Sequence, residues 1–441
     1  MPLRRLVLLA LVLALLAGRA RAQEENPTVV VTPSGEATRY KAAVQRFAGD
    51  AELALKLRQA IGEGLEFSSL FQIVNPQAFL GSDVSGPLDG GPPVVCPDWS
   101  QIGADALVEG VVVGRGETLA VEFRVWDVAR CQKLERKRFS GKSGDLVFLG
   151  HKVADAVVAA FTGKPGVSAT EVAFVSDRTG KREVYVTDVV GGTPKQLTHN
   201  NTINAFPGWS PDGSAIVYTS YREARRPYLF VLTRGSQSPG RVFRNLNPAW
   251  QVFRGVFDPT GSKLALVISI EGQSEIFSID RNGSGLRRIT NSPTLEVSPS
   301  YSPDGSQMVF VSDRTGAPQI YVMNADGSGI RRLTYNGSYN TGPAWSPDGK
   351  WIAYESQVGG QFDIWLIDPS GSANVPLATS PANDEGASWS PDGRKIVFAS
   401  KRRGESDLYV VDRDGSNLRS ITSGGRNNVD PAWGPYDRDL R

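Results

Sequence analysis

The feature that most constrains the fold is a short motif, aromatic-Ser-Pro-Asp-Gly, that recurs through the C-terminal two-thirds of the chain. Its copies, including variants and one shortened copy, lie at Trp209–Gly213, Phe257–Gly261, Tyr301–Gly305, Trp345–Gly349, Trp389–Gly393 and Trp433–Pro435. Successive aromatic residues of the motif are 48, 44, 44, 44 and 44 positions apart. A period of about 40–45 residues with four short strands per unit is typical of a β-propeller.

Each repeat is predicted to contain four strands separated by tight turns. In the unit 386–422 a short first strand ends at Trp389, and Ser-Pro-Asp-Gly then places Pro and Gly where a type I turn favours them. Runs of β-branched and aromatic residues, bounded by Gly, Pro, Asp and Asn, indicate the later strands. They are predicted at 395–400, 407–412 and 417–422.

The two ends of the repeat array complement each other. Residues 171–198 supply a second, third and outer strand, but no first strand precedes them. Residues 430–433 supply a first strand with nothing after it. Joining the two ends completes a sixth blade and removes an exposed strand edge. We therefore predict that residues 166–441 form a six-bladed β-propeller closed by its C-terminal strand.

The region 35–165 has a different pattern and predicts a small α/β domain. Asp50 can cap a helix that runs through Gly64, and Asp145 can cap a second helix. Strands are expected at 40–47, 71–75, 106–113, 119–125 and 134–139, and a short helix at 99–103. The predicted fold class is thus an α/β N-terminal domain followed by an all-β six-bladed propeller.

The first 22 residues have the composition of a secretory signal peptide. Arg4 and Arg5 precede the apolar run Leu6–Ala17, and Ala20-Arg21-Ala22 matches an A-x-A cleavage site. The run is shorter than the roughly 20 residues of a spanning helix, although an uncleaved anchor is the alternative. Removing the four arginines of this segment takes the net charge from +2 to −2. A weakly acidic chain is a poor match for nucleic acid.

The remaining chemistry is sparse. Cys96 and Cys131 are the two cysteines, and they can form one disulfide or remain two buried free thiols. His151 and His199 are far apart and have no metal-ligand spacing around them. We expect the aspartates of the repeated turns, and the two Ser-Asp-Arg-Thr-Gly segments at 176–180 and 312–316, to stabilise turns. No catalytic, cofactor-binding or metal-ligating residue is assigned.

One column of the repeat could bind a partner. Five positions before each repeat aromatic the chain places a mostly polar set: Asn204, Val252, Glu296, Asn340, Asp384 and Asn428. Lying between an outer strand and the next inner strand, these residues are expected to ring one mouth of the central channel. They either cap loops or form an exposed polar rim for a protein ligand. The acids Glu296 and Asp384 would then favour a basic or amide-rich partner.

The chain resembles the TolB family, the exported components of the Tol–Pal system of Gram-negative envelopes. The resemblance rests on the repeats closed by 431–436, on the segment 99–106 leading into Val111-Val112-Val113-Gly114, and on the signal peptide. It covers essentially the whole mature chain. Cys96, Cys131 and an irregular second blade around 225–240 depart from the family pattern.

The resemblance implies an adaptor without chemistry. It implies a monomer in the periplasm that binds the lipoprotein Pal through the propeller and maintains outer-membrane integrity and invagination during division. It also implies that residues 23–34 bind the inner-membrane protein TolA. In that segment the residues of interest are Glu24, Glu25, Val29, Val30 and Val31, since a short β-rich run near a terminus can add as a strand to a partner. No cofactor is implied.

A second hypothesis is a carbohydrate lyase or hydrolase that uses the propeller channel. Oligogalacturonate lyases share the repeat, but such enzymes need a histidine-rich metal site. Only His199 lies near the expected channel of this chain. The adaptor hypothesis is therefore preferred, and metal analysis of the purified protein would separate the two.

Overall fold

The computed structural model describes residues 39–90, 93–223, 225–236, 241–242, 247, 249–424 and 426–437. The predicted signal peptide and the predicted TolA-binding segment lie outside the described residues. No helix in the described ranges is long and apolar enough to cross a membrane.

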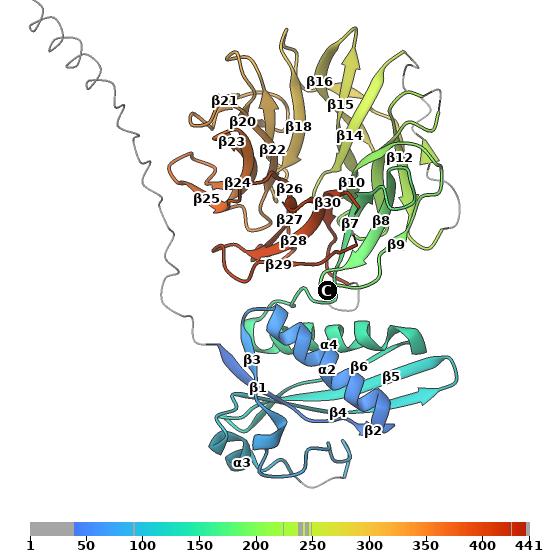
Figure 1. Ribbon diagram of the computed structural model, residues 1–441, viewed down its shortest axis with the longest axis vertical. Coiled ribbons are helices and arrows are strands. Elements are labelled where there is room, and N and C mark those ends of the chain that lie inside the picture. The colour runs from blue at the N-terminus through green and yellow to red at the C-terminus, as the bar shows by residue number, and fades with distance from the viewer. Residues whose placement is uncertain are drawn as a thin grey trace, which may run out of the picture. The chain divides into compact units, whose positions relative to one another are not determined.

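The N-terminal region is a mixed sheet covered on one face by two helices (Figure 1). Its strand order is β3-β1-β4-β5-β6, with the short β2 paired to β4. The strands are β1 (Tyr40–Val44), β2 (Ala48–Gly49), β3 (Phe71–Ile73), β4 (Ala106–Arg115), β5 (Thr118–Asp127) and β6 (Gln132–Lys142). The helical elements are α2 (Ala51–Phe67), η1 (Pro76–Ala78), α3 (Cys96–Gln101), η2 (Ser143–Asp145) and α4 (Leu146–Thr162).

Local sequence explains how the two long helices begin and meet. The Asp50 carboxylate accepts hydrogen bonds from the amides of Glu52 and Leu53, as its predicted capping role requires. Asp145 does not cap α4 in this way, because its side chain accepts from the Lys142 amide instead. Gly150 lets the helices approach closely, since a Cβ there would lie 2.6 Å from the Ala60 Cβ.

A disulfide joins Cys96 of α3 to Cys131 in the turn between β5 and β6. It resolves the choice between a bridge and two free thiols in favour of the bridge. The bond ties a short helix, which has no side-chain hydrogen bond at its N-cap, to the edge of the sheet. A covalent cross-link of this kind stabilises mainly by restricting the unfolded chain.

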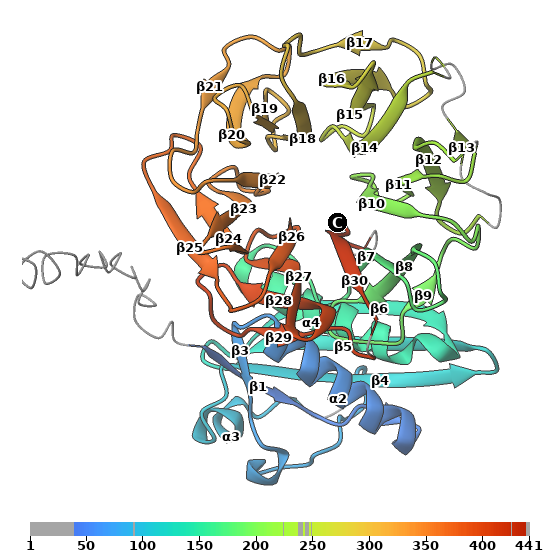
Figure 2. The ribbon, with the colours of Figure 1, turned by 45° about the horizontal axis from the view of Figure 1, so that its top comes forward.

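The C-terminal region is a ring of six four-stranded antiparallel sheets (Figure 2). The first two blades are β10 (Asn204–Trp209), β11 (Ala215–Ser220), β12 (Tyr228–Thr233), β13 (Arg241–Val242) and β14 (Gln251–Phe257), β15 (Lys263–Ile270), β16 (Gln273–Asp280), β17 (Arg287–Arg288). The next two are β18 (Glu296–Tyr301), β19 (Gln307–Ser312), β20 (Gln319–Asn324), β21 (Arg331–Arg332) and β22 (Asn340–Trp345), β23 (Ile352–Val358), β24 (Gln361–Ile367), β25 (Asn374–Ala378). The fifth is β26 (Asp384–Trp389), β27 (Lys395–Arg403), β28 (Glu405–Asp412) and β29 (Arg419–Ser420).

The sixth blade combines both ends of the array, as the repeat predicts. The last strand, β30 (Asn428–Trp433), pairs antiparallel with β7 (Glu171–Ser176), and the sheet continues through β8 (Glu183–Asp188) and β9 (Lys195–Gln196). Asn428 lies opposite Ser176, and Trp433 lies opposite Val172. The buried Trp433 indole donates to the Thr170 hydroxyl at 2.7 Å. The ring is closed by hydrogen bonds between residues about 260 positions apart.

The C-terminal end of α2 contacts the propeller. Phe67 stacks on Trp433 with ring centroids 6.5 Å apart, and the Arg419 guanidinium lies 4.0 Å from the centre of the Phe67 ring. The ammonium of Lys395, at the start of β27, donates to the Ser69 hydroxyl at 2.9 Å. These contacts bring α2 against the beginning of β27 and the end of β30.

Candidate protein-binding site

The two ends of the propeller ring differ in what they contact. Strand β27 begins at Lys395, which bonds to Ser69 of the α/β region, and it ends at Arg403. Arg403 therefore belongs to the other end of the ring, which we call the distal mouth. Among the described residues, the distal mouth consists of connections that precede innermost strands and of hairpins between second and third strands. These hairpins lie at 177–182, 221–223 with 225–227, 271–272, 313–318, 359–360 and 401–404.

The column predicted to form an exposed rim is buried. The side chains of Asn204, Val252, Glu296, Asn340, Asp384 and Asn428 are all at most 1% exposed. Five of them are the first residues of innermost strands, and Val252 is the second residue of β14. The expectation of an exposed polar rim is wrong, because each polar member is enclosed and hydrogen-bonded to nearby side chains or backbone.

Arginines from the distal hairpins enclose three of these side chains. Arg314 donates to both carboxylate oxygens of Glu296, at 2.9 and 3.0 Å, and Arg402 does the same for Asp384 at 3.0 and 2.9 Å. Arg178 donates to Asn428 across the ring closure. Burial raises the pKa of Glu296, while hydrogen bonds from Ser312 and Arg314 lower it. Both acids are thus paired internally and do not favour a basic partner.

The same arginines are held in place by aromatic rings. The Arg314 guanidinium lies 5.9 Å from the ring centre of Phe310 and 5.0 Å from that of Tyr321. Arg402 repeats the arrangement over Phe398 and Tyr409, at 5.4 and 4.8 Å. Cation–π contact orients each guanidinium before it reaches the carboxylate. The Ser-Asp-Arg-Thr-Gly segments form turns, as predicted, and in addition they supply Arg178 and Arg314. Arg402 comes from the Ser-Lys-Arg-Arg-Gly segment at 400–404.

A different column of the repeat faces the channel. Three positions before each repeat aromatic the backbone adopts a positive φ, at Phe206, Arg254, Ser298, Gly342, Gly386 and Asp430. The register of every innermost strand shifts at this place, as in a β-bulge. A non-glycine residue there costs about 1 kcal/mol or more. The bulges aim the side chains into a channel of about 660 Å3 that these residues line.

The channel carries charge of both signs. The Arg254 guanidinium, the Glu355 carboxylate and the Asp430 carboxylate all line it and are half-buried. Burial raises the pKa of Glu355 to about 7, and burial also raises the pKa of Asp430. Each acid accepts a backbone hydrogen bond, Glu355 from Gly386 at 2.8 Å and Asp430 from Phe206 at 3.2 Å. The channel is therefore a polar recess with a net acidic lining.

Large apolar side chains are exposed around the distal mouth. Tyr335 is 73% exposed and Tyr339 is 39% exposed, both on the connection between β21 and β22. Ile203, before β10, is 47% exposed. Tyr339 packs edge-on against Phe362 with centroids 5.6 Å apart, so its ring is already ordered. Tyrosine is one of the residue types enriched at the energetic centres of protein interfaces.

Comparison with known proteins identifies the family. A family model described as the TolB beta propeller domain matches residues 161–437, and one described as the TolB amino-terminal domain matches residues 27–134. The chain belongs to the TolB family. It is 35% identical over 304 residues to the Tol-Pal system protein TolB of Anaeromyxobacter dehalogenans (strain 2CP-C), with 68% of each chain covered.

Other members of the TolB family support the assignment. The chain is 35% identical over 237 residues to the Tol-Pal system protein TolB of Desulfosudis oleivorans, covering 53% of this chain and 52% of that relative. Its structure is similar to the crystal structure of TolB from Acinetobacter baumannii, with a TM-score of 0.72 and 25% identity. That similarity covers 90% of this chain and 97% of the other. The α/β region and the six-bladed propeller are thus a TolB-type fold.

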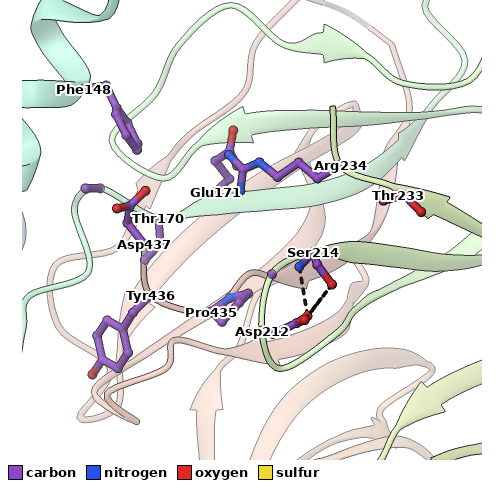
Figure 3. A pocket seen from close by; sticks show the side chains of 12 residues that line it. Phe148, Thr170, Glu171, Asp212, Ser214, Thr233, Arg234, Pro435, Tyr436 and Asp437 are labelled. Carbon is purple, nitrogen blue, oxygen red and sulfur yellow. Dashed lines mark hydrogen bonds and ion pairs between the residues drawn. The ribbon is translucent and has the colours of Figure 1, made fainter. Parts of the chain in front are cut away.

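A second recess of about 570 Å3 lies where Phe148 of α4 faces the first and sixth blades (Figure 3). Its charged groups neutralise one another. Arg234 pairs with Glu171 at 2.6 Å, and Asp437 pairs with Lys152 at 3.1 Å. Burial raises the pKa of Glu171, and Arg234 opposes that shift. These pairs join the start of β7 to the end of β12, and residue 437 to α4, so we interpret this recess as part of the TolB scaffold.

The sequence contained a signal for the channel column that the repeat search passed over. Gly342 and Gly386 occupy the same repeat position in adjacent units, and glycine is favoured at a positive φ. Of the two histidines, His151 is buried in α4, whereas His199 is exposed at the distal mouth. Over the described ranges, no three His, Cys, Asp or Glu side chains are arranged to hold a metal ion.

Proposed function

We propose that the chain is a periplasmic protein-binding adaptor of a Tol–Pal-like system. In this proposal it binds a Pal-like lipoprotein at the distal mouth of the propeller, and it maintains outer-membrane integrity and invagination during division. The observation that carries the proposal is the pair of exposed tyrosines, Tyr335 and Tyr339, beside the open channel. Membership of the TolB family favours this function over the lyase or hydrolase alternative.

The residues proposed to contact the partner are exposed neighbours of the buried column and not the column itself. Glu296, Asn340 and Asp384 would act by holding the strand ends and hairpins in position, since their side chains are enclosed. The partner would contact Tyr335, Tyr339 and the channel-facing Phe206. Buried aromatic anchors in such an interface each contribute about 2 kcal/mol or more.

The N-terminal segment is proposed to bind a TolA-like inner-membrane protein. This rests on the sequence of residues 23–34, which begins with Glu24 and Glu25 and continues into Val29, Val30 and Val31. Three consecutive β-branched residues near a terminus can add as a strand to the exposed sheet edge of a partner. Export by cleavage after residue 22 would place this segment at the mature terminus.

Binding measurements test both assignments. The chain from residue 23 would be titrated with the lipid-free Pal-like protein and with the TolA-like domain of the same organism. Changing Tyr335 and Tyr339 together to Ala should weaken Pal binding at least about tenfold. The matched control changes Leu286 and Ile330, exposed apolar residues at the other end of the ring, to Ala and should leave it unchanged.

Deletion of residues 23–32 separates the two partners. The deletion should abolish TolA capture and leave Pal affinity unaltered. Equal weakening by the tyrosine and control variants would place the Pal site elsewhere. Loss of both partners, or of neither, on deletion would contradict the role of the N-terminal segment.

A further inference from the structure

Three neighbouring blades each present a basic hairpin at the distal mouth. The hairpins connect β7 to β8, β11 to β12 and β27 to β28, and these blades are adjacent because β30 and β7 close the ring between the first and fifth blades (Figure 2). Their exposed cations among the described residues, which we call the basic arc, are Lys181, Arg182, Arg222, Arg225, Arg226, Lys401 and Arg403.

Strand pairing makes these hairpins project beyond the channel rim. Asn428 lies opposite Ser176 and Asn204 lies opposite Ser220, which are the last residues of β7 and β11. In the fifth blade Asp384 lies opposite Ser400, and β27 continues beyond that pair to Arg403. In all three blades the chain continues several residues beyond this pair before the third strand begins. The cations of the basic arc therefore lie past the first residues of the innermost strands.

The charge of the mouth is asymmetric. The other three hairpins at this end are Glu271-Gly272, the segment 313–318 and Gly359-Gly360, and together they carry two acids and one arginine. Near the basic arc the exposed acids are Glu223 and Glu405, while Asp384 is already paired with Arg402. Without its first 22 residues the chain is slightly acidic, so the basic arc does not reflect its average composition.

We propose that the basic arc steers and orients an acidic surface of the protein that docks at the distal mouth. This inference rests on the proposed function and adds the chemistry of the partner. Clustered exposed charges act over about a Debye length and raise association rates more than they lower dissociation rates. The acidic face of the partner would lie over the first, fifth and sixth blades, and its apolar part over Tyr335 and Tyr339.

The recess inside the basic arc favours a protein over an anionic membrane. Three acids, Glu355, Glu385 and Asp430, line the channel that the arc borders, against one arginine, Arg254. The centre of the mouth is therefore less favourable for negative charge than the arc is. A flat phosphate surface presents the same charge everywhere and would face those carboxylates. A folded partner can place acids over the arc and apolar or basic groups over the channel. The observed pattern of charges suits that second arrangement.

Charge reversal on the hairpins tests the inference. Two variants, Lys401→Glu with Arg403→Glu and Lys181→Glu with Arg182→Glu, would be compared with the wild type for binding the lipid-free Pal-like protein. At low salt the association rate should fall about tenfold or more, with the dissociation rate nearly unchanged. The rate should also depend less on salt. The control, Lys195→Glu with Lys350→Glu, reverses exposed charges away from the mouth.

The outcomes distinguish this inference from the proposed function. A wild-type chain that does not bind the Pal-like protein overturns the proposed function. Wild-type binding with unchanged association rates in both arc variants overturns the basic-arc inference alone. The basic-arc inference is also overturned if the wild type binds phosphatidylglycerol vesicles, the arc variants do not, and all of them bind the Pal-like protein equally well. Melting curves verify folding, and Lys401→Gln with Arg403→Gln replaces any variant that fails to fold.

Discussion

Arginine side chains stabilise the distal mouth by pairing with buried side chains. Arg314 reaches Glu296 from a hairpin 18 positions later in the chain, and it lies against two aromatic rings on the way. A carboxylate enclosed in this way is stable only while its cation is present, because a buried unpaired charge is expensive. The column that resembles a polar rim in the sequence therefore has a structural role: its side chains hold the innermost strands to the hairpins.

Arg314→Ala should destabilise the propeller by about 3 kcal/mol, since it leaves Glu296 buried without its partner. Thermal or denaturant unfolding measures the loss. Adding Glu296→Gln to this variant should recover part of the stability by removing the charge. Arg331→Ala, an exposed arginine of the same blade, is the control and should cost less than about 1 kcal/mol. Equal losses of unfolding free energy in Arg314→Ala and Arg331→Ala would contradict the structural role of the Arg314–Glu296 pair.

His151 makes the protein sensitive to acid. Its ring is 2% exposed, and neither ring nitrogen has a hydrogen-bond partner among the described residues. Burial, and secondarily the nearby Arg419, lowers the pKa of His151 to about 4. The unfolded histidine titrates near pH 6.5, so between pH 6.5 and 4 the unfolded chain binds more protons. Folding stability from this residue is thus complete above pH 6.5 and is lost as the pH falls.

The unfolding free energy of the wild type and of His151→Leu would be compared at pH 7.5 and pH 5. The wild type should lose about 2 kcal/mol more than the variant on acidification. Burial raises the pKa of Asp155 to about 7, which has the opposite effect on stability over this range. Both chains carry Asp155, so its effect cancels in the comparison. An identical pH dependence in both chains would exclude His151 as the cause.

At the scale of strands and turns, local sequence predicts the blades but does not predict the residues of the binding site. The Ser-Pro-Asp-Gly turns define where each first strand ends, and this is why the six blades could be predicted. The first strand of the fifth blade starts at Asp384 rather than near 387, because the bulge at Gly386 lets pairing continue past it. Its outer strand is shorter than predicted, since β29 pairs with one neighbour within its sheet.

The channel residues could not be predicted from spacing alone. Phe206, Arg254 and Asp430 face the channel because a register shift turns them inward, and a shift in pairing depends on the whole sheet. The burial of Asp384 likewise depends on Arg402 folding back from a hairpin. The sequence pattern singled out the column that is buried in the structure and missed the column that faces the channel.

Removal of β30 should prevent the ring from closing. Truncation after Asn428 leaves β7 with an unpaired edge and removes Trp433, whose loss alone costs about 3–5 kcal/mol. We expect aggregation or the loss of a cooperative melting transition. Truncation after Asp437 keeps β30 and should melt like the full chain. A chain ending at Asn428 that keeps the wild-type melting temperature would disprove this closure.

At the scale of the whole molecule, one aromatic contact couples the α/β region to the ring. Phe67 at the end of α2 packs on Trp433, which also closes the propeller. The Arg419 guanidinium stacks on the Phe67 side chain. The residue that completes the sixth blade therefore also supports the neighbouring region. Disturbing Phe67 should change how the two regions unfold together.

Phe67→Ala should split one unfolding transition into two in scanning calorimetry. Phe67 is 4% exposed, and its loss from the contact costs about 3–5 kcal/mol. The control is Phe71→Ala, which empties the core of the α/β region away from the propeller. It should lower stability without splitting off the propeller transition. Identical melting profiles for the two variants would show that Phe67 does not couple the regions.

Closure by β30 also determines when, during biosynthesis, the propeller can form. The strand that completes the sixth blade is β30, so the partner of β7 is synthesised after β8 to β29. Until then β7 has an open edge and the ring cannot form, however much of the chain has left the ribosome. For a chain exported as proposed, the ring can close only after β30 has followed β7 through the translocation pore.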